Sequence, residues 1–168
     1  MPDDPAPAVP FKRSFTSAAF GDPGSAFADH VGHRLTEWSD GHARMELAIG
    51  AQHANRHDRV HGGVILTILD DVGGRTGCYC SVPGNYRVSA TISFTCNFLQ
   101  AAKTARLIAD GRMVKSGRRS YTALVELRDA EGNLIAVGQG AYRYATGSEN
   151  PEGIPRPQIG AASLAAPE

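Results

Sequence analysis

The second half of the chain contains four stretches in which apolar and polar residues alternate. The first runs from Val88 to Phe98 without a break, and the others cover residues 104–115, 120–128 and 134–144. A period of two residues is typical of a β-strand with one buried face. Because short loops join the four stretches, they predict neighbouring strands of an antiparallel sheet.

Two more strands and a long helix are expected in the first half. Residues 33–39 and 42–49 are typical of a hairpin around the turn "SDG" at residues 39–41. A strong helix is expected from His61 to a point before Gly84, and a short one near residues 25–32. One long helix that covers one face of about six antiparallel strands gives an α+β fold.

The chain has 168 residues, which suggests a single domain. Residues 1–25 hold five of the ten prolines and are expected to form an irregular leader. Residues 147–168 are rich in proline, glycine and alanine without any period, which predicts a disordered tail. The folded domain is therefore expected at residues 26–146.

The composition limits which binding partners and which cellular compartment are expected. The 17 Lys and Arg residues balance 17 Asp and Glu residues, so neither nucleic acid nor a membrane is expected as a partner. The apolar runs are too short to span a bilayer, and the acidic, proline-rich N-terminus is not expected to act as a secretory signal. Three cysteines, Cys78, Cys80 and Cys96, are best explained as free thiols, which predicts a cytoplasmic protein.

The long helix has an unusual face. Successive residues lie 100° apart, so the side expected against the sheet carries Val64, Ile65, Ile68, Leu69, Val72 and Thr76. Asp70 is expected on the opposite side, among Gly63, Leu66, Thr67, Gly73, Gly74 and Gly77. Each helical glycine costs about 1 kcal/mol relative to alanine, which suggests that another backbone or a ligand approaches this face closely. Asp71 lies four residues before Arg75, where an ordinary ion pair can form.

Gly62 and Gly63 stand at the expected start of this helix. The N–H groups of a first helical turn lack intrahelical partners, and without side chains they could bind a ligand oxygen, as in an oxyanion hole. Asn55 could donate or accept a hydrogen bond nearby. The full spacing, Asn-x5-His-Gly-Gly-x6-Asp from Asn55 through His61 to Asp70, is more specific than the glycine pair alone.

Three segments, at residues 55–71, 90–102 and 117–143, resemble the acyl-CoA thioesterases of the hotdog fold, in particular the PaaI-like (phenylacetate-pathway) branch. The resemblance covers about residues 27–145. It implies a curved antiparallel sheet around one long helix, and an acyl-CoA substrate without any further cofactor. It also implies homodimers, often paired into homotetramers, with active sites at the subunit interface.

The resemblance also implies roles for individual residues. Asp70 would be the catalytic carboxylate, and the Thr91 hydroxyl would help to hold the attacking water. The Gly62 N–H would polarise the thioester carbonyl, with Asn55 and His61 in the polar positions beside it. Asp70 and Thr91 would come from one subunit, and Gly62 and Asn55 from the other. One departure is that "FLQAA" lacks the usual proline, and Gln100 stands where the family often has arginine.

Contacts to the substrate are predicted at two places. Gly63, Leu66 and Phe94 are candidates beside the acyl group. Lys115, Arg118 and Arg119 lie in the turn "KSGRRS" and form either a solvated turn or a clamp for the phosphates of coenzyme A.

Some residues also allow interpretations other than a thioesterase. His53, His57 and His61 repeat every four residues, but no matching ligand set stands elsewhere, so no metal is expected. Cys78 and Cys80 could form a redox pair, although packing is the simpler explanation.

Hydrolysis would use Asp70 as general base or as nucleophile. The alternatives are a hydratase of enoyl or hydroxyacyl thioesters, whose Asp/His spacing is not found, and a non-catalytic acyl-CoA-binding protein.

Overall fold

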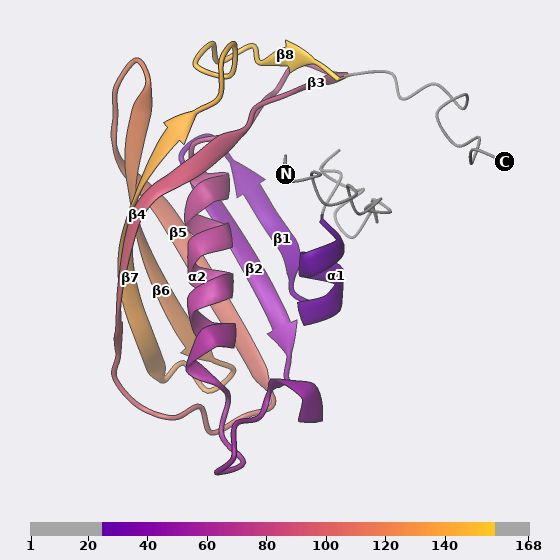
Figure 1. The fold of residues 1–168 in the computed structure, drawn as a ribbon, viewed down its shortest axis with the longest axis vertical. Helices are drawn as coiled ribbons and strands as arrows, with labels where there is room; N and C mark the ends of the chain where they lie inside the picture. The colour runs from indigo at the N-terminus through magenta and orange to yellow at the C-terminus, as the bar shows by residue number, and fades with distance from the viewer. Residues whose placement is uncertain (1–24, 157–168) are drawn as a thin grey trace, which may run out of the picture.

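A computed structural model describes residues 25–156, which form one curved antiparallel sheet around a central helix (Figure 1). The sheet has six strands, as the alternating stretches predict. They are β1 (Arg34–Ser39), β2 (His42–Ala48), β4 (Ser89–Phe98), β5 (Arg106–Ser116), β6 (Ser120–Asp129) and β7 (Leu134–Tyr144). Their order in the sheet is β1-β2-β5-β6-β7-β4, so the α+β prediction is confirmed.

Strand β4 forms one edge of this sheet. It pairs with β7 from Ser89↔Tyr144 to Phe98↔Ala136, and a bulge shifts the register between Thr91 and Ser93. The alternation in the sequence does not reveal this bulge. Within residues 25–156 no strand pairs with the other side of β4, which leaves that edge open.

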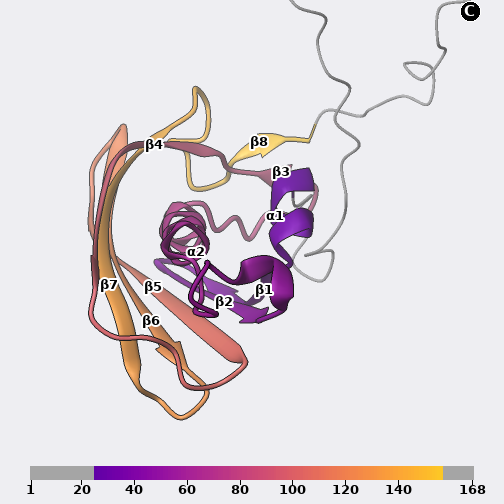
Figure 2. The ribbon, with the colours of Figure 1, turned by 60° about the horizontal axis from the view of Figure 1, so that its bottom comes forward.

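Helix α2 (Gly62–Thr76) lies in the concave side of the sheet, as Figure 2 shows with the helix nearly end-on. Its predicted inner face is confirmed, with Val64 only half-buried and the other members buried. This face packs against apolar residues of the sheet, among them Leu107, Val125, Leu127 and Ile135. Removing these side chains from water stabilises the sheet and the helix together.

The glycines of α2 have a different neighbour from the one expected. Gly73 and Gly77 are buried, and they face tyrosines of the protein's own sheet. A Cβ on Gly73 would lie 2.2 Å from the Tyr142 hydroxyl oxygen, and one on Gly77 would lie 2.5 Å from the Tyr121 ring. The prediction that these two glycines lie on the outer face is therefore wrong. The helix ends at Thr76 with Gly77 as its C-cap, within the predicted limit before Gly84.

The ends of the domain also differ from the expectation. The short helix α1 (Ala26–Val31) is present and is capped by Ser25, and a 3₁₀ turn, η2 (Ala51–His53), precedes the loop to α2. Residues 147–156 are ordered, because β8 (Ile154–Pro155) pairs with β3 (Asn85–Tyr86) near the C-terminal end of α2 (Figure 1). Ordered structure therefore continues past the expected boundary at residue 146, through β8. Residues 1–24 and 157–168 of the expected leader and tail lie outside the described residues.

None of the helices in residues 25–156 is long and apolar enough to cross a membrane.

Candidate active site

The carboxylate of Asp70 meets the hydroxyl of Thr91 between helix and sheet. Asp70 is half-buried in the third turn of α2, and Thr91 on β4 donates a hydrogen bond of 3.0 Å to its Oδ1. Burial raises the pKa of the Asp70 carboxyl, and the nearby charge of Asp71 acts in the same direction. The hydroxyls of Thr91 and Tyr142 only partly offset this rise. A half-buried carboxylate with a raised pKa is suited to accept a proton.

Asp71 lies on a different flank of the helix and has partners of its own. Nε2 of the buried His33 donates to its Oδ2 at 2.7 Å, and Nε of Arg75 lies 3.4 Å from its Oδ1. Burial alone would raise the pKa of Asp71, but His33 and Arg75 outweigh it and lower the pKa. The expected pair with Arg75 is present, and the sequence pattern did not reveal the one with His33.

The first turn of α2 leaves one backbone donor free. His61 caps the helix, because the Gly63 N–H donates to its Nδ1 at 2.9 Å. The carbonyl of His61 accepts from Val64 N and Ile65 N, at 3.0 and 3.3 Å. Among residues 25–156 the N–H of Gly62 has no acceptor, whereas the N–H of Gly63 is already occupied. Of the two glycines, Gly62 is therefore the one whose N–H could donate to a ligand oxygen.

Asn55 shapes the loop that leads into the helix. Its Oδ1 accepts from the N–H groups of His57 at 2.8 Å and of Arg59 at 3.2 Å. A bridge between Ala54 and Val60 closes the same loop. Through these bonds Asn55 sets the approach of the chain to His61 and Gly62.

The three histidines before the helix do not converge. His53 is buried, with Nε2 donating to the Val31 carbonyl at 2.7 Å and Nδ1 accepting from Gly50 N at 2.8 Å. His57 is exposed, and His61 is the helix cap. Nowhere in residues 25–156 do three or more metal-ligating side chains gather.

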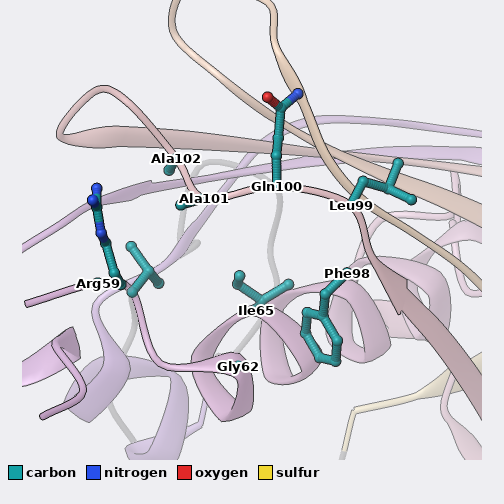
Figure 3. A pocket seen from close by; sticks show the side chains of 9 residues that line it. Arg59, Gly62, Ile65, Phe98, Leu99, Gln100, Ala101 and Ala102 are labelled. Atoms are coloured by element: carbon teal, nitrogen blue, oxygen red, sulfur yellow. The ribbon is translucent and has the colours of Figure 1, made fainter. Parts of the chain in front are cut away.

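A pocket of about 320 Å³ opens beside Gly62 (Figure 3). Its wall is mostly apolar and is formed by Arg59, Val60, Gly62, Ile65, Phe98, Leu99, Gln100, Ala101 and Ala102. The amide of Gln100 is turned to the Leu134 carbonyl, at 2.9 Å. The guanidinium of Arg59 has no hydrogen bond or ion pair with any described residue and is the one charged group on the wall. Sequence patterns did not indicate Arg59, since it looks like any other exposed loop residue.

The remaining predicted contacts are spread over the molecule. Leu66 is 41% exposed on the outer face of α2, whereas Phe94 is half-buried and packs into the core. Lys115, Arg118 and Arg119 are exposed around the β5–β6 hairpin and do not line the pocket.

The cysteine side chains have separate neighbours. The thiol of Cys78 is buried 3.3 Å from the Ser89 hydroxyl, and that of Cys80 contacts the Glu152 carbonyl at 3.2 Å. All three thiols, including Cys96, are free.

The two halves of the expected site are far apart within one chain. Asp70 follows Gly62 by eight residues, and a rise of 1.5 Å per residue separates them by about 12 Å along the helix axis. A single thioester carbonyl cannot contact the Gly62 N–H and a water on Asp70 of the same chain. If both groups act on one carbonyl, they must come from two copies of the chain.

Comparisons with known proteins agree with this fold. The profile of the thioesterase superfamily matches residues 57–136. A Halobacterium salinarum protein, provisionally described as an esterase, is 30% identical over 125 residues, which cover 67% of this chain and 80% of that protein.

Two solved structures have the same fold. A Haemophilus influenzae thioesterase superposes with a TM-score of 0.66 at 14% identity, covering 82% of this chain and 92% of that one. A Streptococcus mutans protein, solved bound to acetyl CoA, gives 0.58 at 21% identity, covering 67% and 88%. The chain belongs to the thioesterase superfamily, a family of hydrolases, and has its hotdog fold.

Proposed function

We propose that this protein hydrolyses acyl-CoA thioesters to a free carboxylic acid and coenzyme A. The observation that carries the proposal is the half-buried carboxylate of Asp70, held by Thr91 and with a raised pKa. A thioester is already activated toward acyl transfer, so a positioned base and an oxyanion donor are sufficient catalytic groups.

The Asp70 carboxylate begins the reaction in one of two ways. As general base, it takes a proton from a water whose oxygen attacks the thioester carbonyl carbon. As nucleophile, it attacks that carbon itself, and water then hydrolyses the resulting anhydride. In both routes the C–S bond breaks, the thiolate of coenzyme A leaves and gains a proton, and the acid is released. Thr91 binds Oδ1, so in this proposal the reacting group meets Oδ2.

The oxyanion donor in this proposal is the Gly62 N–H of a second protomer. The distance along α2 supports this, because one chain cannot present both groups to one carbonyl. The open edge of β4 offers a surface for the partner, and it carries two exposed apolar side chains, Ile92 (61%) and Phe98 (55%). We therefore propose a homodimer with two shared sites. The pairing of dimers into tetramers stays a prediction.

Coenzyme A as the leaving group is supported by the pocket beside Gly62. Its apolar wall suits the pantetheine arm. The guanidinium of Arg59, which has no partner within residues 25–156, suits a phosphate. Lys115, Arg118 and Arg119 are further candidates for the phosphates. The related fold from Streptococcus mutans, which binds acetyl CoA, adds support.

The direct test is thiol release from a panel of acyl-CoA thioesters. We expect Asp70→Asn to lower kcat by about 10² to 10⁴. Asp71→Asn, which alters the adjacent carboxylate, is expected to retain turnover. A wild-type protein that hydrolyses no thioester of the panel, or an Asp70→Asn variant with full activity, contradicts the proposal.

The same acyl group on N-acetylcysteamine tests the contribution of coenzyme A. This substrate lacks the phosphates, so Arg59→Ala should lower kcat/KM for the CoA thioester by about tenfold and leave the truncated thioester unaffected. Arg56→Ala, which removes an exposed arginine outside the pocket, is the matched control. Equal losses with both substrates would show that Arg59 does not contact the phosphates.

A further inference from the structure

Three tyrosines of the sheet pack under the C-terminal half of α2. The rings of Tyr121 and Tyr142 are stacked with centroids 5.1 Å apart, and the tilted ring of Tyr144 lies 5.0 Å from that of Tyr121. Tyr121 and Tyr142 are 2% and 1% exposed. A buried phenol needs a partner for its hydroxyl, so the hydroxyl contacts show what each tyrosine holds in place.

The hydroxyl of Tyr142 binds at the residue that carries the proposed catalytic group. It donates to the backbone carbonyl of Asp70 at 3.3 Å. By contrast, the hydroxyl of Tyr121 donates to the carbonyl of Gly74 at 2.6 Å and also contacts Ser89. Among the described residues, Asp70 is the hydrogen-bond partner of Tyr142 and of no other tyrosine.

Two glycines make room for this contact. A Cβ on Gly73 would lie 2.2 Å from the Tyr142 hydroxyl oxygen, and one on Gly140 would lie 2.3 Å from it. Glycine within a helix is less stable than alanine by about 1 kcal/mol, yet Gly73 stands inside the last turn of α2. Any larger residue at position 73 would force the hydroxyl away from Asp70.

The Tyr142 hydroxyl also acts on the carboxyl group electrostatically. It lowers the pKa of Asp70, and the Asp70 charge together with burial raises the pKa of Tyr142. Thr91 from β4 and Asp71 from α2 are the other groups that act on the Asp70 carboxyl. The carboxylate is thus approached by one hydroxyl from β4 and another from β7.

We propose that Tyr142 is a positioning residue, whose hydroxyl holds the α2 turn at Asp70 so that the carboxylate faces Thr91 and the thioester. The proposal rests on the proposed function. Within it, Tyr142 contacts neither substrate nor water. Thr91 binds the side chain of Asp70 and Tyr142 binds its backbone, so together they fix both ends of the residue.

Tyr142→Phe removes the hydroxyl and leaves the stacked ring. We expect kcat to fall about tenfold with KM changed by less than about twofold, because the base is displaced while substrate binding is retained. The acid limb of the pH profile of kcat/KM should move to higher pH, because the removed hydroxyl lowers the pKa of Asp70.

The matched control is Tyr121→Phe. It deletes a buried tyrosine hydroxyl from the same cluster and should lower Tm at least as much, since its bond to Gly74 is shorter. It should leave the pH profile in place. If kcat and the pH profile change equally in Tyr142→Phe and Tyr121→Phe, Tyr142 contributes only packing and the proposal is wrong. An unchanged pH profile in Tyr142→Phe would overturn the proposal as well.

Two further measurements test the positioning role even if Tyr142→Phe does not fold or the protein does not hydrolyse thioesters. Gly73→Ala displaces the hydroxyl by steric contact and should shift the pH profile in the same direction, which covers a Tyr142→Phe variant that does not fold. The pKa of the Asp70 carboxyl, followed by carbon NMR, should be higher in Tyr142→Phe than in the wild type. That measurement needs no turnover, so a failure of the proposed thioesterase activity remains distinguishable from a failure of the positioning role.

Discussion

At the residue scale, Asp70 and Asp71 are neighbours in the sequence with opposite surroundings. Asp70 has hydroxyl partners and no cation, so burial dominates and raises its pKa. Asp71 is paired with His33 and Arg75, which lower its pKa. A raised pKa means that the ionised group destabilises the folded state, and a lowered pKa means that it stabilises the folded state.

The two carboxylates should therefore respond oppositely to the same change. At pH 7 we expect Asp70→Asn to raise Tm, because the ionised form opposes folding above the raised pKa. Asp71→Asn should lower the free energy of unfolding by about 1 to 2 kcal/mol, through the loss of charged hydrogen bonds. Thermal unfolding between pH 7 and pH 3 measures both effects.

The dependence on pH provides the check. The ionised Asp71 stabilises the folded state at any pH above the pKa of an aspartate in the unfolded chain. This stabilisation is lost as the pH falls through the lowered pKa of Asp71 in the folded state. The Tm values of Asp71→Asn and the wild type should therefore converge in acid. The gain in Asp70→Asn should also fade in acid, where the wild-type carboxyl is protonated. A lower Tm for Asp70→Asn at pH 7 would contradict this account.

The sequence indicated Asp70 through its position on the helix and its motif, and Thr91 through the resemblance. Tyr142 was not predicted, because its contact with Asp70 depends on where β7 crosses under α2. A signal did exist: Gly140 stands two residues before Tyr142 on the same face of the strand, which leaves space beside a large ring. Only the crossing of helix and strand shows that this space lies under Asp70.

At the element scale, the start of α2 offers a substitution that removes a single N–H group. Gly62 is the first helical residue after the cap His61, a position where proline is readily tolerated. A Cβ there would meet Phe98 at 3.5 Å, an ordinary contact. Gly62→Pro should therefore keep the fold and lower kcat by about 10² to 10³, the usual loss for one oxyanion donor.

Gly62→Ala is the control for this substitution. It adds a similar Cβ and retains the N–H, so thiol release should remain close to that of the wild type. Equal losses in the alanine and proline variants would indicate a steric effect in the pocket and argue against an oxyanion donor at Gly62.

The C-terminal segment is a second element with a testable role. The buried Ser148 accepts a hydrogen bond from Val88 N at 3.0 Å, and its carbonyl accepts from Arg87 at 2.9 Å. A chain ending after Thr146 leaves both donors without these partners and should be less stable by about 2 kcal/mol. A chain ending after Arg156 keeps the contacts, and a thermal melt showing equal Tm for the two chains would refute this role.

Alternation predicted the six long strands well, because each has one face on a common core. It could not predict β3 and β8, since two-residue strands have no period and their pairing joins segments far apart in the chain. The end of α2 at Thr76 agrees with the predicted limit before Gly84. The apolar pattern continues past Thr76, so the sequence could not place this end more closely.

At the scale of the whole molecule, the fold leaves the proposed site incomplete in one chain. Asp70 and Thr91 lie together, whereas the free Gly62 N–H and its pocket stand two turns earlier on the same helix. The sequence suggested this division of the site between two protomers only through the resemblance. The residue pattern of one chain does not show which residues of a partner face it across an interface. The helix geometry supplies an independent physical reason for it.

The most direct test of this division is complementation between two inactive variants. Asp70→Asn and Gly62→Pro chains are unfolded together in equal amounts, refolded, and assayed for thiol release from an acyl-CoA that the wild type hydrolyses. Random pairing makes half of the dimers mixed, and each mixed dimer has one intact site, so activity should return to about a quarter of the wild-type value. A mixture no more active than the two variants refolded separately would contradict a site shared between protomers.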